Sequence, residues 1–208
     1  MKKVLIYGDS NTWGDNFITG KRIPNENQWP NILSKKLGSN YKVLQEGLPG
    51  RLAGDEEEKK YKNGRDTFIA TFKINAPIDI VIIALGTNDL QIKYNKSAKK
   101  VIEDLLYYKA AINELYCDKD DRKKYFLNDI KPTIKYILPF NFDYKKNASI
   151  IFNENSEQKR LEIIKYFMDN NIDSVVLEEI DLFEDGIHLN YSGHEKMAKK
   201  MEEVITKK

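Results

Sequence analysis

The sequence predicts an α/β protein, a three-layer α/β/α sandwich around a five-stranded parallel sheet. Short apolar runs alternate along the chain with longer segments of helical periodicity. One run, Ile78 to Leu85, is almost continuously hydrophobic, which is typical of a parallel strand covered on both faces. Strands that alternate with helices need crossover connections, and these connections place helices on both sides of the sheet. We expect the strands to follow the flavodoxin-like order.

Each apolar run and each periodic segment accounts for one element, in chain order. The strands are expected at residues 3–7, 41–45, 78–85, 135–140 and 174–177. The helices are expected at residues 28–37, 97–115, 156–169 and 192–205. Gly38 closes the first of these helices, because glycine readily adopts the left-handed conformation that ends a helix.

Two charged stretches fall outside this alternation. Residues 54–66 are expected to form a solvated loop or a short helix. Residues 116–129 are similar, but Tyr125 and Phe126 make them a candidate lid over a site, and the role of the wider segment 116–155 stays open. The chain shows no internal repeat or linker, so we expect one domain over residues 1–208.

The composition excludes several classes of protein. Charged residues make up 32% of the chain, but they nearly cancel to a net charge of +2, which gives no reason to expect a nucleic-acid partner. The single Cys117 rules out an internal disulfide and fits a reducing compartment. Two histidines and one cysteine cannot form the usual zinc site, and no phosphate-binding glycine motif occurs. We therefore expect neither a metal nor a cofactor.

The first residues imitate the opening of a secretory signal but lack its length. Met1-Lys2-Lys3 precedes an apolar run that stops at Gly8-Asp9, short of the roughly 7–15 apolar residues of a signal peptide. No other run approaches the ~18 apolar residues of a membrane span. We expect a cytoplasmic protein without a membrane span. The oligomeric state stays open, and a homo-oligomer is compatible with the sequence.

Residues suited to catalysis follow four of the predicted strands. Ser10 follows the first strand, Gly47 and Gly50 follow the second, Asn88 follows the third, and His188 lies in the loop after the fifth. In an open parallel sheet, ligands bind beyond the carboxyl ends of the strands. We therefore expect these four segments to meet at one edge of the sheet.

A serine needs a neighbouring base before it can act as a nucleophile, and the chain offers two histidines. Ser192 and Glu195 have the spacing of a capping box, which would place His194 in the first turn of the last helix. There the helix dipole disfavours protonation and makes the imidazole a poorer base. His188 precedes that helix, and Asp185 can accept a hydrogen bond from its imidazole. The sequence therefore favours His188 as the base.

Each motif also has a purely structural interpretation. Gly8-Asp9-Ser10 fits a strand-ending turn with a helix cap, and Thr12 stands where a nucleophile elbow has its second glycine. The run Gly86-Thr87-Asn88-Asp89 fits an Asx-turn, and Asp185-Gly186-Ile187-His188 fits a turn with a buried histidine. The presence of all three motifs at matching strand ends favours the catalytic interpretation.

Together, these motifs resemble the sequence blocks of the SGNH (GDSL-type) hydrolase family. The blocks span nearly the whole chain, and they are Gly8-Asp9-Ser10, Gly50, Gly86-Thr87-Asn88-Asp89 and Asp185-x-x-His188. Three further stretches look like the arylesterase and acyltransferase branch of the family: Thr12-Trp13-Gly14, Glu46-Gly47-Leu48-Pro49-Gly50-Arg51 and Gln28-Trp29. The resemblance implies the SGNH hydrolase fold.

The resemblance also implies a role for each matched residue. Ser10 would be the nucleophile, His188 the base and Asp185 its partner. The oxyanion would be held by the backbone N–H of Ser10, the backbone N–H of Gly50 and the side-chain amide of Asn88. Preorganised donors of this kind lower the barrier to attack on an ester carbonyl.

We expect a serine esterase that hydrolyses short-chain esters of small molecules through an acyl-enzyme. An acyltransferase that moves the acyl group to an alcohol would use the same residues. A non-catalytic binding module on the same fold is a third alternative. The segment from Asp118 to Asn155 offers no family match, so the sequence leaves the substrate open.

Overall fold

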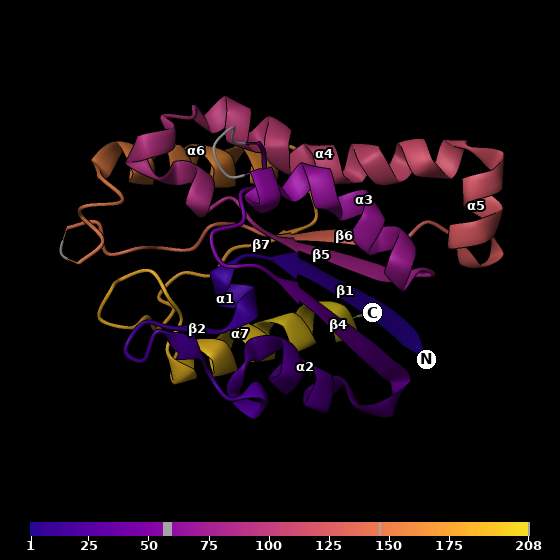
Figure 1. Cartoon of the computed structure of the whole chain (residues 1–208), viewed down its shortest axis with the longest axis horizontal. Helices are drawn as coiled ribbons and strands as arrows, with labels where there is room; N and C mark the ends of the chain where they lie inside the picture. Colours follow the sequence, from indigo (N-terminus) through magenta and orange to yellow (C-terminus); the bar gives the residue numbers. More distant parts are fainter. Residues whose placement is uncertain (56–59, 146, 208) are drawn as a thin grey trace.

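The central element of the fold is a five-stranded parallel sheet in the order β4-β1-β5-β6-β7 (Figure 1). A computed structural model describes residues 1–55, 60–145 and 147–207. The strands are β1 (Lys2–Gly8), β4 (Tyr41–Gly47), β5 (Ile80–Ala84), β6 (Thr133–Ile137) and β7 (Ser174–Val175). All four strand pairings are parallel. This arrangement confirms the predicted sheet and its flavodoxin-like order.

Helices cover both faces of the sheet, as predicted (Figure 1). One face carries α3 (Gly64–Asn75), α4 (Ala98–Cys117) and α6 (Glu154–Asp169), and the other carries α2 (Trp29–Leu37) and α7 (Tyr191–Thr206). Alternate residues of each strand point to opposite faces. In β1, Leu5 and Tyr7 join the core beneath α3 and α4, whereas Val4 and Ile6 join the core beneath α2 and α7.

Four shorter elements lie between the long ones, in addition to several short 3₁₀ turns. Helix α1 (Ser10–Trp13) follows β1 directly. An antiparallel pair of two-residue strands, β2 (Asp15–Asn16) and β3 (Lys21–Arg22), comes next. Helix α5 (Lys119–Tyr125) follows α4. None of the helices in the described ranges combines the length and the apolar character that crossing a membrane requires.

The structure corrects two predictions about the elements. Helix α3 was not predicted, because only Gly64, Phe68 and Phe72 are fully buried along it and its apolar stripe is too narrow to show periodicity. The charged stretch 54–66 was expected as a loop or short helix, and its residues 56–59 lie outside the described ranges. Strand β6 begins and ends earlier than predicted. The apolar run beyond Ile137 continues because Leu138 and Phe140 are buried in the loop that follows.

The candidate lid is not a lid. Helix α5 lies at the end of the molecule that holds both chain termini, opposite to α1 (Figure 1). Phe126 is buried there against Phe72 and Tyr116, with ring centroids 5.7 and 5.2 Å apart. The aromatic residues of this segment therefore extend the core beneath α3 instead of covering a site.

Candidate active site

The nucleophile candidate Ser10 is the first residue of α1, at the carboxyl end of β1. Asp9 caps the helix, since its side chain accepts a hydrogen bond from the backbone N–H of Asn11. Gly8 allows the tight turn before it, because a Cβ there would collide with the side chain of Thr12. Ser10 is 6% exposed and therefore largely buried. The first N–H groups of a helix have no intrahelical acceptor and favour a negative charge nearby.

The structure brings the three predicted triad residues together. The distance from Ser10 Oγ to His188 Nε2 is 3.0 Å, and the distance from His188 Nδ1 to Asp185 Oδ2 is 2.5 Å. The second oxygen of Asp185 accepts hydrogen bonds from the backbone N–H groups of Ile187 and His188, both at 3.1 Å. This Asx-turn fixes the carboxylate against its own loop. Nδ1 of the imidazole therefore faces the acid, and Nε2 faces the serine hydroxyl.

Nearby carboxylates tune the charge of His188. Burial lowers the pKa of its imidazole, but the hydrogen bond and the charge of Asp185 outweigh burial, so the pKa is raised. Asp15 adds to this effect, with its Oδ2 atom 3.9 Å from Nε2. Burial opposes the ionisation of Asp185, but the hydrogen bonds from His188 and Ile187 hold its pKa below the usual range. An imidazole with a partner on each nitrogen can take a proton from one and remain oriented by the other.

His194 lies in the core and does not reach the serine. It is fully buried in α7, and its Nδ1 atom accepts a hydrogen bond of 3.1 Å from the backbone N–H of Trp29. Burial lowers the pKa of His194 to about 4, with a smaller contribution from His188. The helical position was predicted correctly, but the predicted capping box is wrong. Asn190 caps the helix, and Ser192 donates to Asp181 instead.

The two candidate oxyanion donors outside α1, Gly50 and Asn88, are connected by the backbone of Arg51. Gly50 has a φ angle of +74°, a left-handed conformation that suits glycine, and Arg51 follows it. The side-chain amide of Asn88 donates a hydrogen bond of 3.1 Å to the backbone carbonyl of Arg51. An amide nitrogen has two N–H groups, so a second donor remains for a ligand. Gly47 pairs with Gly8 and lies against the backbone of Trp13, which brings the start of this loop beside the nucleophile.

Sequence reasoning missed two residues that join these segments. Asn11 accepts a 2.8 Å hydrogen bond from the backbone N–H of Leu189 and donates to the carbonyl of Ile187, so it holds the loop on both sides of His188. Arg51 is buried and donates from Nη1 to the carbonyls of Gly8 and Glu46, at 2.9 and 2.5 Å. Both residues stand directly beside predicted site residues, at Ser10 and Gly50. Only that adjacency signals their importance in the sequence.

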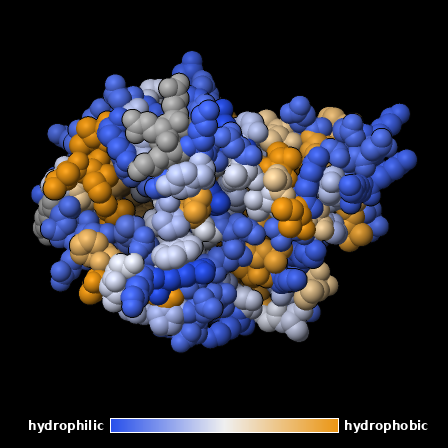
Figure 2. Space-filling view, viewed as in Figure 1, coloured by the Kyte–Doolittle hydropathy of each residue, from blue (hydrophilic) through white to orange (hydrophobic). Residues whose placement is uncertain are grey.

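A cleft of about 490 Å³ opens beside His188. The residues that line it are Phe17, Asn147, Ile151, Glu184, Asp185, Ile187 and His188. Phe17 is 52% exposed and Ile151 is 36% exposed, so part of the lining is accessible apolar surface. Figure 2 shows a gathering of hydrophobic residues at the left end of the molecule, where the loop between β6 and α6 lies in Figure 1. In the described part of the chain, no cluster of three histidine, cysteine or acidic side chains could hold a metal ion.

Comparisons with known proteins identify the family of the chain and agree with its fold. The chain matches the family model of the GDSL-like lipases and acylhydrolases over residues 4–201. A solved carbohydrate acetylesterase family member from Sinorhizobium meliloti superimposes with a TM-score of 0.80 at 23% identity, covering 99% of this chain and 97% of its own. An aryl esterase from M. smegmatis gives 0.79 at 20% identity, covering 99% and 98%. No curated protein matches the sequence. The chain therefore belongs to the family of GDSL-like lipases and acylhydrolases, whose members are esterases.

Proposed function

We propose that the protein is a serine esterase that hydrolyses short-chain carboxylic esters of small molecules. The observation that carries the proposal is the chain of contacts from Ser10 through His188 to Asp185. A serine hydroxyl at hydrogen-bond distance from a carboxylate-oriented imidazole is the arrangement that activates a weak nucleophile. The cleft of about 490 Å³ beside it falls in the size range of small-molecule sites.

The reaction would proceed in two halves. In the first, Nε2 of His188 takes the proton of Ser10 as Oγ attacks the ester carbonyl. The resulting oxyanion would be stabilised by the N–H groups of Ser10 and Gly50 and by the Asn88 amide. His188 then gives its proton to the departing alkoxide, which leaves an acyl group on Ser10. In the second half, His188 activates water, and hydrolysis of the acyl-enzyme releases the acid and restores the serine.

The position of the cleft suggests which part of the ester it holds. The leaving oxygen must come within hydrogen-bond reach of His188, because this imidazole protonates it. The cleft begins at His188, so we assign it to the alcohol portion of the ester. Its apolar residues Phe17, Ile151 and Ile187 would contact that portion.

The test is steady-state hydrolysis of aryl esters whose acyl chains run from acetyl to octanoyl. We expect turnover that is highest for the short acyl chains and that disappears in Ser10→Ala. Near-wild-type turnover by Ser10→Ala would refute the mechanism, and a preference for the longest chains would refute the short-chain assignment.

Acyl transfer to an alcohol is a second candidate, favoured by the apolar lining of the cleft beside His188. An apolar cleft binds an alcohol with a hydrocarbon portion and disfavours water. If transfer dominates, adding a small alcohol to the assay should convert most of the acyl groups into a new ester. If hydrolysis dominates, free acid should remain the main product.

A further inference from the structure

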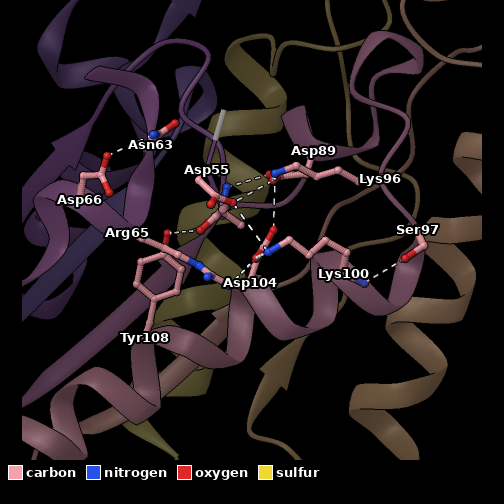
Figure 3. A network of polar contacts seen from close by, with 12 residues as sticks. Asp55, Asn63, Arg65, Asp66, Asp89, Lys96, Ser97, Lys100, Asp104 and Tyr108 are labelled. Atoms are coloured by element: carbon pink, nitrogen blue, oxygen red, sulfur yellow. Dashed lines mark hydrogen bonds and ion pairs between the residues drawn. The ribbon is translucent and has the colours of Figure 1, made fainter. Parts of the chain in front are cut away.

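Figure 3 shows a network of ion pairs around two buried carboxylates, Asp89 and Asp104. It contacts the loop that follows Gly50 at Ala53 and Gly54. Its centre is Asp89, the residue after Asn88, which is fully buried. The Asp89 carboxylate accepts hydrogen bonds from the backbone N–H groups of Ala53, at 2.7 Å, and Gly54, at 3.3 Å. The ammonium of Lys96 lies 2.8 Å from the same carboxylate. Asp89 thus connects the loop after β5 to the loop after β4.

The Lys96 ammonium is itself held by a second buried acid. Its Nζ atom lies 3.4 Å from Asp104 on α4, a carboxylate that also pairs with Arg65 and with Lys100. Gly54 fits only because it has no side chain, since a Cβ there would collide with the Asp104 carboxylate. The loop, the short turn at Asn88–Leu90 and α4 therefore pack around Asp89 and Asp104, which are both fully buried.

The contacts of Asp89 favour its ionised form, because its carboxylate oxygens accept from two backbone N–H groups and from an ammonium. Burial raises the pKa of its carboxyl group above the usual range, and Lys96 and the two backbone N–H groups offset only part of that rise. All three of these partners are donors, so only the carboxylate satisfies them. Burial would lower the pKa of Lys96, but Asp89 and Asp104 outweigh it and raise that pKa. Loss of either charge would leave the other buried without its partner, which is strongly unfavourable.

Two consecutive residues therefore hold one loop from two sides. Asn88 donates to the carbonyl of Arg51, and Asp89 accepts from Ala53 and Gly54 two and three residues later. Tyr108 adds a hydrogen bond of 2.6 Å to the carbonyl of Ala53. Gly50 begins the same loop. Its N–H and the Asn88 amide can act on one oxyanion only if the loop and the turn keep a fixed relative position.

We propose that Asp89, held by Lys96, is a positioning residue for the oxyanion site. It fixes residues 50–54 against the turn at Asn88, so that the Gly50 N–H and the Asn88 amide converge. This inference rests on the proposed esterase mechanism, because it assigns the network to the stabilisation of an oxyanion. Asp89 itself contacts neither substrate nor reacting atoms in this scheme.

The test compares Asp89→Asn and Lys96→Met with Lys100→Met in the hydrolysis of a short-chain aryl ester. Lys100 is the matched control, because it lies four residues after Lys96, on α4, and pairs with Asp104 but does not reach Asp89. We expect Asp89→Asn and Lys96→Met to lower kcat by roughly 10- to 100-fold with little change in KM. Lys100→Met should keep kcat close to the wild-type value. The pH midpoint of kcat/KM should not move, because His188 is untouched.

A double-mutant cycle separates positioning from general destabilisation. If Asp89 acts through the oxyanion donors, Asp89→Asn should lower kcat by a much smaller factor in an Asn88→Ala background than in the wild type. Rates are expressed per reactive serine, counted by stoichiometric labelling with an organophosphate, so unfolded protein does not contribute. If Asp89→Asn fails to fold, the positioning role is tested by comparing kcat of Lys96→Met with kcat of Lys100→Met.

The outcomes distinguish this inference from the proposed function. If the wild type hydrolyses esters through Ser10 but Lys96→Met matches Lys100→Met in kcat, the positioning role is refuted while the esterase mechanism stands. Equal losses for Asp89→Asn in both backgrounds would also refute it. If the wild type shows no Ser10-dependent hydrolysis, the proposed function is refuted, and the positioning role is refuted with it.

Discussion

The imidazole of His188 lies among three carboxylates that all favour its protonated form. Asp185 contacts Nδ1, Asp15 lies 3.9 Å from Nε2, and Asp9, the residue that caps α1, has a smaller effect. Their combined effect raises the pKa of His188 above its ordinary value of about 6.5. A protonated imidazole cannot accept the serine proton. Esterase activity should therefore rise as the pH passes this raised pKa.

Asp15→Asn should shift the pH midpoint of kcat/KM to a lower value. Removal of this negative charge makes the imidazolium less stable, so His188 loses its proton at lower pH. The rate at high pH should be unchanged, since His188 is neutral there in both proteins. Asp169→Asn is the control, because Asp169 pairs with Lys165 on the surface of α6. A midpoint that moved equally in both variants would show that Asp15 does not act on His188.

Asn88→Ala tests whether the amide acts on the oxyanion or only on the loop. A hydrogen bond that strengthens in the transition state should make kcat fall by roughly 10²–10³ while KM changes little. Loss of the contact to the Arg51 carbonyl alone should cost about 1 kcal/mol of stability and leave most of the turnover. Kinetics and a thermal melt of the same variant distinguish the two. A large melting shift with near-normal kcat would remove Asn88 from the oxyanion site.

Two elements place the two histidines in different environments. The loop before α7 exposes His188 to the cleft, and Asn11 of α1 holds that loop by its backbone. Helix α7 buries His194 against the first residue of α2. The two histidines are therefore only six residues apart but have different roles. His188 can exchange protons with a substrate, whereas His194 stabilises the packing of α7 against α2.

His188→Ala should lose activity but keep its stability, whereas His194→Ala should lose stability but keep its activity. His188→Ala should lower kcat by roughly 10⁴–10⁶ and leave the melting temperature near the wild-type value. His194→Ala should lower the free energy of unfolding by roughly 2–4 kcal/mol, because it leaves a cavity and an unpaired Trp29 N–H. Its kcat should stay near the wild-type value at a temperature where it is folded. Comparable losses of kcat in both folded variants would contradict the assignment of the base.

At the scale of the whole molecule, the site follows from the sheet. The carboxyl ends of parallel strands meet at one edge, so the positions of Ser10, Asn88 and His188 after the first, third and fifth strands were enough to predict that these segments lie at the same edge. The contacts of Asn11, Arg51 and Asp89 could not be predicted in the same way. Each of these side chains forms a hydrogen bond with the backbone of a segment distant in the sequence, and no local sequence pattern indicates which segment that is.

The two errors in the predicted fold have a related cause. Helix α3 shows its buried positions, Phe68 and Phe72, only once the sheet that covers them is in place. Phe126 reads in the sequence as an exposed aromatic in a charged stretch, but it packs against Phe72 in the folded chain. In α3 the apolar stripe was too narrow to show periodicity, and around Phe126 the charge density suggested solvent exposure; long-range packing determines both segments.

The position of α5 makes a prediction about distance. This helix packs near the end of α3, where Lys73 pairs with Asp121 and lies over the ring of Tyr125. That region is at the opposite end of the molecule from α1 (Figure 1). Tyr125→Ala should therefore leave kcat and KM unchanged within error in the ester assay, although it lowers the melting temperature. A clear change in KM would revive the lid interpretation.

Covalent labelling of Ser10 tests the central claim most directly. The protein would be incubated with a diethyl organophosphate and its intact mass measured, beside Ser10→Ala and His188→Ala. An activated serine attacks phosphorus and releases the leaving group, so the wild type should gain one diethylphosphoryl group, located on the peptide that contains Ser10. Ser10→Ala should gain nothing, and His188→Ala should react far more slowly. An unlabelled wild type, or equal labelling of Ser10→Ala, would contradict the account.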